Sequence, residues 1–245
     1  MPTVSQKRRR PFVFKQFTIY HDRCAMPLST DSILLGAWVS IDTDRYLLDV
    51  GSGCGIISLM LAQRNPLCTI DAIEIDFESY QQGLENINAS RWVGRIHAYH
   101  NNFVDYVRQC TQKYDHVVCN PPFFQHDLQS PHSHRTIARH AHSLSFAELI
   151  KGATAILSDQ GKLSVIIPYS GKDDFIRECL KNDLFCIRAT GVRSTIRMPF
   201  MRSLFTFARV PRPLEETILT LYHNGPKQPT AEYAQLTKAF YLKME

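Results

Sequence analysis

The stretch VVCNPPFF, residues 117–124, places an asparagine, two prolines and an aromatic pair directly after a hydrophobic run. Because proline fixes its own backbone and has no N–H, the side-chain carbonyl of Asn120 and the backbone carbonyl of Pro121 are two hydrogen-bond acceptors on a stiff turn. Phe123 adds a flat face on which a planar ring can stack. Two such acceptors can bind both N–H groups of a conjugated amine and orient its lone pair toward an electrophile. This chemistry needs neither a metal nor a covalent nucleophile.

A glycine loop lies upstream in DVGSGCGI, where Asp49 precedes Gly51, Gly53 and Gly55. Glycines let the backbone turn sharply and let a ligand approach the main chain. The dinucleotide fingerprint G-x-G-x-x-G would require glycine at the next position, which is Ile56. The spacing D-x-G-x-G-x-G instead resembles the loop of methyltransferases that use S-adenosylmethionine (SAM).

Two polar residues follow the next two strand-like runs. Glu74, in DAIEID, comes at the separation from the loop that suits a carboxylate binding ribose hydroxyls. Asn102 follows the third run, where methyltransferases of this class usually carry an aspartate that contacts the adenine of the cofactor. An amide oxygen can accept the same bond without charge. The loop and these two residues together predict a site for a nucleoside cofactor.

The elements that position these residues alternate between strand and helix patterns. Strand-like runs are YLLDV, TIDAIEI, RIHAYH, YDHVVC and KLSVIIP, with helical patterns between them. One helix is expected to bury the face that carries Phe77, Tyr80, Leu84 and Ile87. LFCIRATGV and RSLFTFARV have no helix between them and predict a hairpin. The pattern predicts an α/β fold, a doubly wound and mostly parallel seven-stranded sheet with a C-terminal antiparallel hairpin at its edge. Such sheets bind ligands beyond the carboxyl ends of their strands.

A longer block, FKQFTIYHDRCAMPLSTDSILLGAW at residues 14–38, resembles the N-terminal signature of bacterial tRNA1(Val) adenine-N6 methyltransferases. The likeness continues through the glycine loop, AIEID, ENIN, NPPF and LTKAFYL, so it spans nearly the whole chain. These enzymes belong to the amino-methyltransferases with an N-P-P-(F/Y/W) motif. The resemblance implies a class I, Rossmann-like methyltransferase fold and SAM as cofactor. It also implies methylation of N6 of the adenine immediately 3′ of the anticodon in that tRNA.

The resemblance also implies roles for individual residues. The target adenine would be held by Asn120, Pro121 and Phe123. Lys15 and Phe17 match the family's KQF and are expected in a flap over the site. The cofactor-binding candidates are Thr30, Asp31, Asp49, Gly51, Gly53, Gly55, Glu74, Asn102 and Asn120.

Base chemistry on structured RNA requires the nucleotide to leave its stack and enter a pocket. Candidates for phosphate contacts are Arg135 and Arg139, in the histidine-rich segment 126–142, and Arg197 near the hairpin. Such contacts bind RNA without reading its sequence. The alternative for these residues is an ordinary solvated surface loop.

The composition of the chain favours some classes of protein and partner and disfavours others. The 245 residues carry a formal net charge of +5, which suits a polyanionic partner without requiring one. Seven scattered cysteines without a C-x-x-C pair argue against a disulfide framework or a zinc site and favour a cytoplasmic location. No apolar run approaches the length of a membrane span. We expect an N-terminal extension over 1–45, consisting of a hairpin or flap and a helix, packed on a methyltransferase domain over 46–245.

Other functions remain open at this level. A methyltransferase acting on ribosomal RNA, on DNA adenine or on a protein glutamine side chain can use the same motif, because these amines pose the same lone-pair problem. A non-catalytic RNA-binding protein on a methyltransferase fold is a further alternative, and the intact loop and motif argue against it. The glycine spacing disfavours a nucleotide oxidoreductase.

Overall fold

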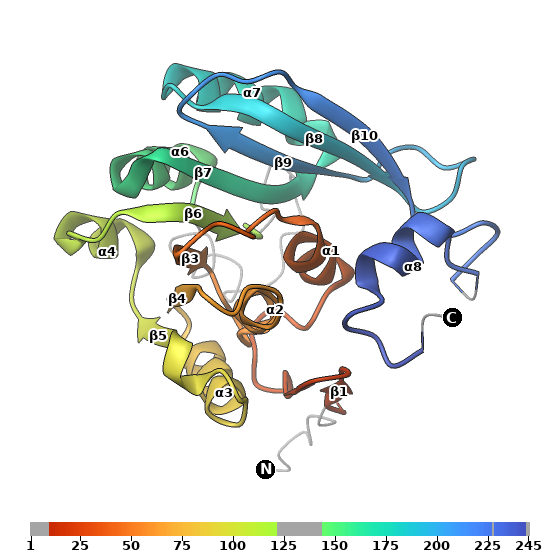
Figure 1. The fold of residues 1–245 in the computed structure, drawn as a ribbon, viewed down its shortest axis with the longest axis horizontal. Coiled ribbons are helices and arrows are strands. Elements are labelled where there is room, and N and C mark those ends of the chain that lie inside the picture. Colours follow the sequence, from red (N-terminus) through yellow and green to blue (C-terminus); the bar gives the residue numbers. More distant parts are fainter. Residues whose placement is uncertain (1–9, 122–143, 227, 244–245) are drawn as a thin grey trace, which may run out of the picture.

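The computed structural model describes residues 10–121, 144–226 and 228–243. Its centre is an eight-stranded sheet in the order β10-β8-β9-β7-β6-β3-β4-β5 (Figure 1). The strands are β3 (Tyr46–Val50), β4 (Thr69–Glu74), β5 (Ile96–His100), β6 (Tyr114–Cys119), β7 (Leu157–Pro168), β8 (Phe185–Arg193), β9 (Arg202–Ala208) and β10 (Glu215–Thr220). A separate pair, β1 (Phe12–Val13) and β2 (Thr18–Ile19), forms a small antiparallel hairpin.

Helices cover both faces of the sheet. One face carries α1 (Thr30–Trp38), α2 (Ile56–Arg64), α3 (Phe77–Asn88) and α8 (Ala231–Thr237). The other carries α4 (Phe103–Gln109), α6 (Phe146–Ile156) and α7 (Lys172–Lys181). The described residues also form two short 3-10 turns, η1 (Val93–Arg95) and η2 (Tyr169–Gly171). Successive strand residues point to opposite faces, so Leu47 joins one core and Leu48 the other. Because both faces are covered, β3 is buried at every residue after Tyr46.

The predicted fold class is confirmed, with one difference at the sheet's edge. β8 and β9 are antiparallel as expected, but β9 lies inside the sheet, between β7 and β8. The edge is an additional strand, β10, which pairs in parallel with β8. The sheet therefore has eight strands and not seven. The sequence of β10, EETILT, gives a weak strand pattern because four of its residues are exposed and only Leu219 is buried.

The buried face of α3 also differs from the prediction. Phe77 is 49% exposed, and the side of the helix that faces the protein carries Ser79, Gln82, Gly83, Asn86 and Ile87. Of the expected apolar face, only Ile87 is buried. Polar side chains can occupy a buried face when each finds a hydrogen-bond partner. Here the partners include backbone groups of the N-terminal segment, described below.

A buried polar series crosses the sheet at Asp44, His116 and Ser164. Asp44 Oδ2 lies 2.8 Å from His116 Nδ1, and His116 Nε2 lies 2.8 Å from Ser164 Oγ. Burial alone would raise the pKa of Asp44, but hydrogen bonds and charges from His116 and Lys162 outweigh it and hold that pKa below its usual value. The order of groups is that of a hydrolase triad, yet Ser164 is completely buried and contacts Thr206. The series therefore stabilises the sheet and does no chemistry on a substrate.

Candidate active site

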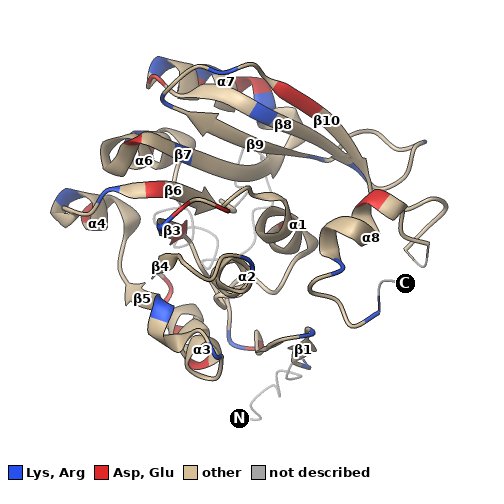
Figure 2. Cartoon of the chain, in the orientation of Figure 1, with Lys and Arg blue, Asp and Glu red and all other residues tan. Residues whose placement is uncertain are grey.

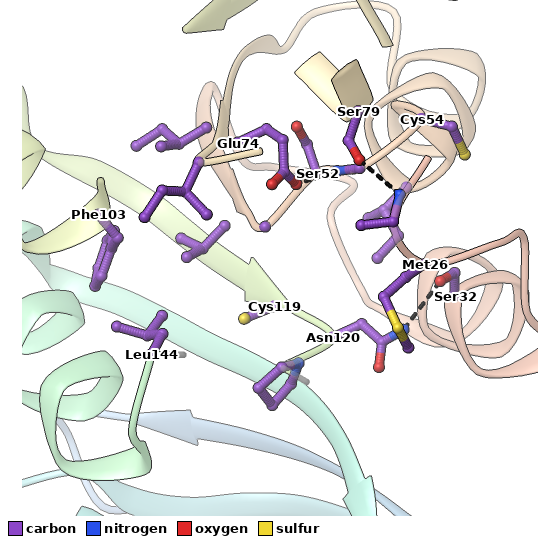
Figure 3. A pocket seen from close by; sticks show the side chains of 18 of the residues that line it. Met26, Ser32, Ser52, Cys54, Glu74, Ser79, Phe103, Cys119, Asn120 and Leu144 are labelled. Carbon is purple, nitrogen blue, oxygen red and sulfur yellow. Dashed lines mark hydrogen bonds between the residues drawn. The ribbon is translucent and has the colours of Figure 1, made fainter. Parts of the chain in front are cut away.

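A cavity of ≈470 Å³ opens at the carboxyl ends of β3, β4 and β6, within the size range of small-molecule sites (Figure 3). The parallel pairing of these three strands brings their ends to one edge. Seven of the candidate residues line the cavity, namely Asp31, Gly51, Gly53, Glu74, Asn102, Asn120 and Pro121. The topology thus brings together residues that are up to 90 positions apart in the chain.

The glycine loop has the backbone its sequence requires. Gly51, Gly53 and Gly55 have φ of +72°, +53° and +80°, in the left-handed region that other residues rarely adopt. Nothing lies within 4 Å of where a Cβ would be on Gly51 or Gly53, so open space borders both. Gly55 does not line the cavity; it precedes α2 and packs against the carbonyl of Gly83 on α3. Gly55 therefore allows α3 to pack closely against the loop, and its predicted contact with a cofactor stays a prediction.

Glu74 ends β4 with only 9% of its surface exposed. Its Oε2 accepts a hydrogen bond from the Gly53 N–H at 2.8 Å, and its Oε1 accepts one from the Asp76 N–H at 2.8 Å. Burial raises the pKa of Glu74, and the two backbone donors oppose that rise. The carboxylate thus holds the glycine loop while it faces the cavity, and each oxygen keeps a further lone pair for a ligand.

Asp49 lies beneath the loop and does not line the cavity, so its predicted contact with a cofactor stays a prediction. It is completely buried near the carboxyl end of β3, where its Oδ2 accepts bonds from the Ser58 N–H at 3.1 Å and the Ser58 O–H at 2.7 Å. Its Oδ1 is buried without a partner among the described residues. Burial raises the pKa of Asp49 to about 7. The residue supports α2 from behind the loop.

Asn102 lines the cavity and caps α4 at the same time. Its Oδ1 accepts a hydrogen bond from the Val104 N–H at 2.8 Å. One lone pair of the amide oxygen therefore binds the helix terminus, and the second is left for a cofactor amine. An aspartate would cap the helix equally well, because both residues are good N-caps.

Asn120 follows β6 and lines the cavity near Met26 and Cys119 (Figure 3). Its Nδ2 donates to Ser32 Oγ on α1 at 2.9 Å, whereas its Oδ1 is buried without a partner among the described residues. A buried acceptor without a donor is costly, and in a binding site it points to a ligand donor. Pro121 is buried beside it.

The N-terminal segment 20–29 forms a further wall, which sequence reasoning did not place. The Tyr20 N–H donates to Asn86 Oδ1 at 3.0 Å, and Asn86 Nδ2 donates back to Tyr20 O at 2.8 Å. The Ala25 N–H donates to Ser79 Oγ at 3.0 Å. These bonds from α3 hold the segment so that five consecutive residues, 25–29, line the cavity. The signal for this arrangement is the polar periodicity of α3, at Ser79, Gln82 and Asn86.

The structure does not bring every candidate to the cavity. Thr30 is exposed at the start of α1, and the lining comes instead from Ser29, Asp31 and Ser32. Lys15 donates from Nζ to the carbonyl of Lys238 at 2.7 Å, far along the chain in the C-terminal segment. Phe17 is buried in ring contacts with Phe14 and Trp92. Lys15 therefore links the N-terminal hairpin to the C-terminal segment, and Phe17 packs the hairpin on the core. Neither residue lines the cavity.

The RNA-contact candidates are only partly described. Arg197 is exposed in the loop between β8 and β9 and does not line the cavity. Phe123, Arg135 and Arg139 lie outside the described residues. Within the described ranges, no group of three or more His, Cys, Asp or Glu could hold a metal ion, and no helix is long and apolar enough to cross a membrane. All seven cysteines fall in the described part of the chain and are free thiols.

Comparisons with known proteins agree with this geometry. Residues 29–182 match the methyltransferase small domain family. The solved structure of a predicted O-methyltransferase from Agrobacterium tumefaciens superposes with a TM-score of 0.69, covering 86% of this chain and 96% of that one at 19% identity. A putative transferase from Pyrococcus horikoshii gives a TM-score of 0.55 at 16% identity, over 80% of this chain and 70% of that one. The sheet order, the glycine loop and the cavity define a class I methyltransferase.

Proteins that are similar in sequence show which family of methyltransferases the chain belongs to. A protein of Flavobacterium psychrophilum named tRNA1(Val) (adenine(37)-N6)-methyltransferase is 41% identical over 95% of this chain and 100% of its own length. A protein of the same name from Trichodesmium erythraeum is 42% identical over 95% of this chain and 98% of its own length. The chain belongs to the tRNA1(Val) (adenine(37)-N6)-methyltransferase family.

Proposed function

We propose that this protein transfers a methyl group from SAM to N6 of an adenine in tRNA, at position 37 of tRNA1(Val), the position named for its relatives. The observation that carries the proposal is the unpartnered Oδ1 of Asn120, a buried acceptor in a cavity bordered by a glycine loop and a strand-end carboxylate. An adenine amine has two N–H donors, one for Asn120 Oδ1 and one for the Pro121 carbonyl.

The residues that line the cavity fit SAM. Open space beside Gly51 and Gly53 lets a ligand approach the backbone, and Glu74 offers its remaining lone pairs to ribose hydroxyls. Asn102 lies where the adenine end of the cofactor is expected, and Asp31 near its methionine end. When bound, SAM supplies an electrophilic methyl group on a sulfonium. Asp49 acts from behind the loop, through Ser58 and α2.

The chain's own contribution to the chemistry is orientation and electrostatics. The amine lone pair of adenine is conjugated into the ring. Asn120 Oδ1 and the Pro121 carbonyl accept its two N–H groups, which directs the lone pair toward the methyl donor. Phe123 is proposed to stack on the base, as the N-P-P-F motif implies. As N6 bonds the methyl carbon, the carbon–sulfur bond breaks and the positive charge passes from sulfur to N6. The two acceptor oxygens stabilise this charge until one N6 proton leaves to water.

RNA binding is proposed for basic side chains on the same side as the cavity. Arg197, in the loop between β8 and β9, follows the carboxyl end of β8. Arg135 and Arg139 remain proposals from sequence. The edge strand β10 is unsuited to phosphates, since Glu215 and Glu216 are exposed on it (Figure 2). The division into an extension, 1–45, and a methyltransferase domain, 46–245, and a cytoplasmic location alongside tRNA are part of the same proposal.

The test uses bulk tRNA from cells that lack this gene. The purified protein is incubated with that tRNA and methyl-labelled SAM, and the tRNA is digested to nucleosides. Label in N6-methyladenosine supports the proposal. Label in another nucleoside, or none in RNA from a protein that still binds SAM, overturns it and directs the search to ribosomal or protein substrates.

A further inference from the structure

The hydrogen bond from Asn120 Nδ2 to Ser32 Oγ joins the end of β6 to the first turn of α1 across 2.9 Å (Figure 3). Ser32 lines the cavity beside Asn120. Neither a strand-end motif nor a helix start indicates by itself that the two residues meet. Their contact gives one half of the carboxamide a protein partner and leaves Oδ1, the other half, without one.

The two halves of a carboxamide have nearly the same shape, and only hydrogen bonding decides which way round it lies. With Oδ1 free, Asn120 presents an acceptor to an amine. Turned by half a rotation, it presents N–H donors to the N–H donors of the same amine. The group that binds Nδ2 therefore determines whether the site attracts or repels the amine.

The surroundings of Ser32 favour its role as acceptor. Ser29 caps α1, and its Oγ accepts from the Ser32 N–H at 3.3 Å. The same Oγ lies 3.3 Å from Ser32 Oγ, so the Ser32 O–H can point to it and turn its lone pairs toward Asn120. The adjacent Asp31 binds Arg202 Nε through Oδ2 at 2.8 Å, which fixes the same helical turn to β9.

We propose that Ser32 is a positioning residue for methyl transfer, which holds Nδ2 of Asn120 so that Oδ1 faces the target amine. The proposal rests on the proposed function for the identity of the amine. It assigns to the first turn of α1 a part in the reaction, although Ser32 itself contacts neither reacting atom.

The kinetic test compares Ser32→Ala, Ser32→Thr and the control Ser40→Ala, whose serine is exposed just beyond the other end of α1 and does not line the cavity. Ser32→Ala is expected to lower kcat roughly 10–100-fold, while KM for SAM stays within about twofold. Ser32→Thr keeps the hydroxyl and is expected to restore kcat to within about fivefold of wild type. A kcat for Ser32→Ala within twofold of wild type would overturn the proposal, as would a loss that appears only in KM for SAM.

A second readout does not require turnover. The side-chain NH₂ signals of Asn120 are identified in a ¹⁵N–¹H spectrum by their absence in Asn120→Asp, and their exchange with water is measured. Ser32→Ala is expected to speed exchange by about tenfold or more, and Ser40→Ala to leave it unchanged. If the wild type methylates no adenine but these signals respond, the proposed function fails and the positioning contact stands. If the wild type is active and the signals are indifferent to Ser32→Ala, the positioning role fails.

Discussion

The backbone N–H of Gly53 donates to Glu74 Oε2 across 2.8 Å, so the carboxylate at the end of β4 holds the glycine loop that follows β3. Glu74→Ala is therefore expected to have two effects. SAM binding weakens by roughly 100-fold through loss of charge-assisted bonds, and the free energy of unfolding falls by about 1–3 kcal/mol because the Gly53 and Asp76 N–H groups lose their acceptor. Calorimetric titration with SAM and thermal unfolding measure the two. Glu78→Ala, an exposed glutamate on α3, is the control, and unchanged SAM affinity in Glu74→Ala would remove this residue from the site.

Asn120→Ala separates catalysis from cofactor binding. The variant loses the unpartnered acceptor, so turnover is expected to fall by at least about 10²–10³-fold, the scale of removing one preorganised hydrogen-bond partner. The SAM dissociation constant is expected to stay within about threefold. Asn120 is a sequence candidate for both sites, but it is proposed to bind the target amine, while the glycine loop and Glu74 are proposed to bind the cofactor. Single-turnover kinetics and calorimetry check the pair, with Asn88→Ala, exposed at the end of α3, as control. An equal loss in turnover and SAM affinity contradicts the assigned role.

Gly83 on α3 tests the contact between that helix and the loop. A Cβ there would lie 2.6 Å from the Gly53 carbonyl oxygen. Alanine favours helix by about 1 kcal/mol over glycine, but overpacking against backbone costs about 1–3 kcal/mol, so Gly83→Ala is expected to lower the melting temperature and weaken SAM binding. Gly94→Ala is the matched control, since nothing lies within 4 Å of its Cβ position. Equal melting temperatures for the two variants would refute the close contact.

The raised pKa of Asp49 predicts that the stability of the protein depends on pH. The unfolded chain loses this proton near pH 3.8, whereas burial keeps it on the folded protein until about pH 7. Because its pKa is raised, the folded state binds more protons than the unfolded state in this window. The contribution of Asp49 to the free energy of unfolding is therefore complete below pH 3.8 and is lost as the pH rises through 7. Asp49→Asn removes the titration. Its melting temperature relative to wild type is expected to increase from pH 5 to pH 8, by an amount corresponding to roughly 1–4 kcal/mol.

Thermal unfolding at both pH values provides that comparison, with the exposed Asp105→Asn as control. A difference between Asp49→Asn and wild type that is the same at pH 5 and pH 8 would show that Asp49 does not titrate in this range.

The local sequence was sufficient to predict the central strands and the main cavity residues. Strand and helix patterns and the glycine spacing are local signals, and parallel pairing then brings the ends of β3, β4 and β6 together. Contacts between distant segments have no such signal. The bond between Ser32 and Asn120 spans 88 positions, and nothing near either residue predicts it.

The difference between local signals and contacts between distant segments also explains which expectations the structure does not match. The apolar face expected on α3 reflects the rule that helices bury apolar residues, but Gln82 and Asn86 are buried because they bind the backbone of the N-terminal segment. Thr30 and Asp31 are neighbours in one motif, yet helical geometry turns only Asp31 toward the cavity. As the edge strand, β10 pairs with β8 alone. Most of its residues are exposed, and its sequence therefore gives a weak strand pattern.

The most direct test of the proposed function uses two transcripts of tRNA1(Val), one with adenine at position 37 and one with guanine there. Each is incubated with the purified protein and methyl-labelled SAM. We expect label in N6-methyladenosine from the first transcript and none from the second. Equal labelling of both transcripts would place the reaction at another nucleotide, and no labelling of either by a protein that binds SAM would contradict the proposed substrate.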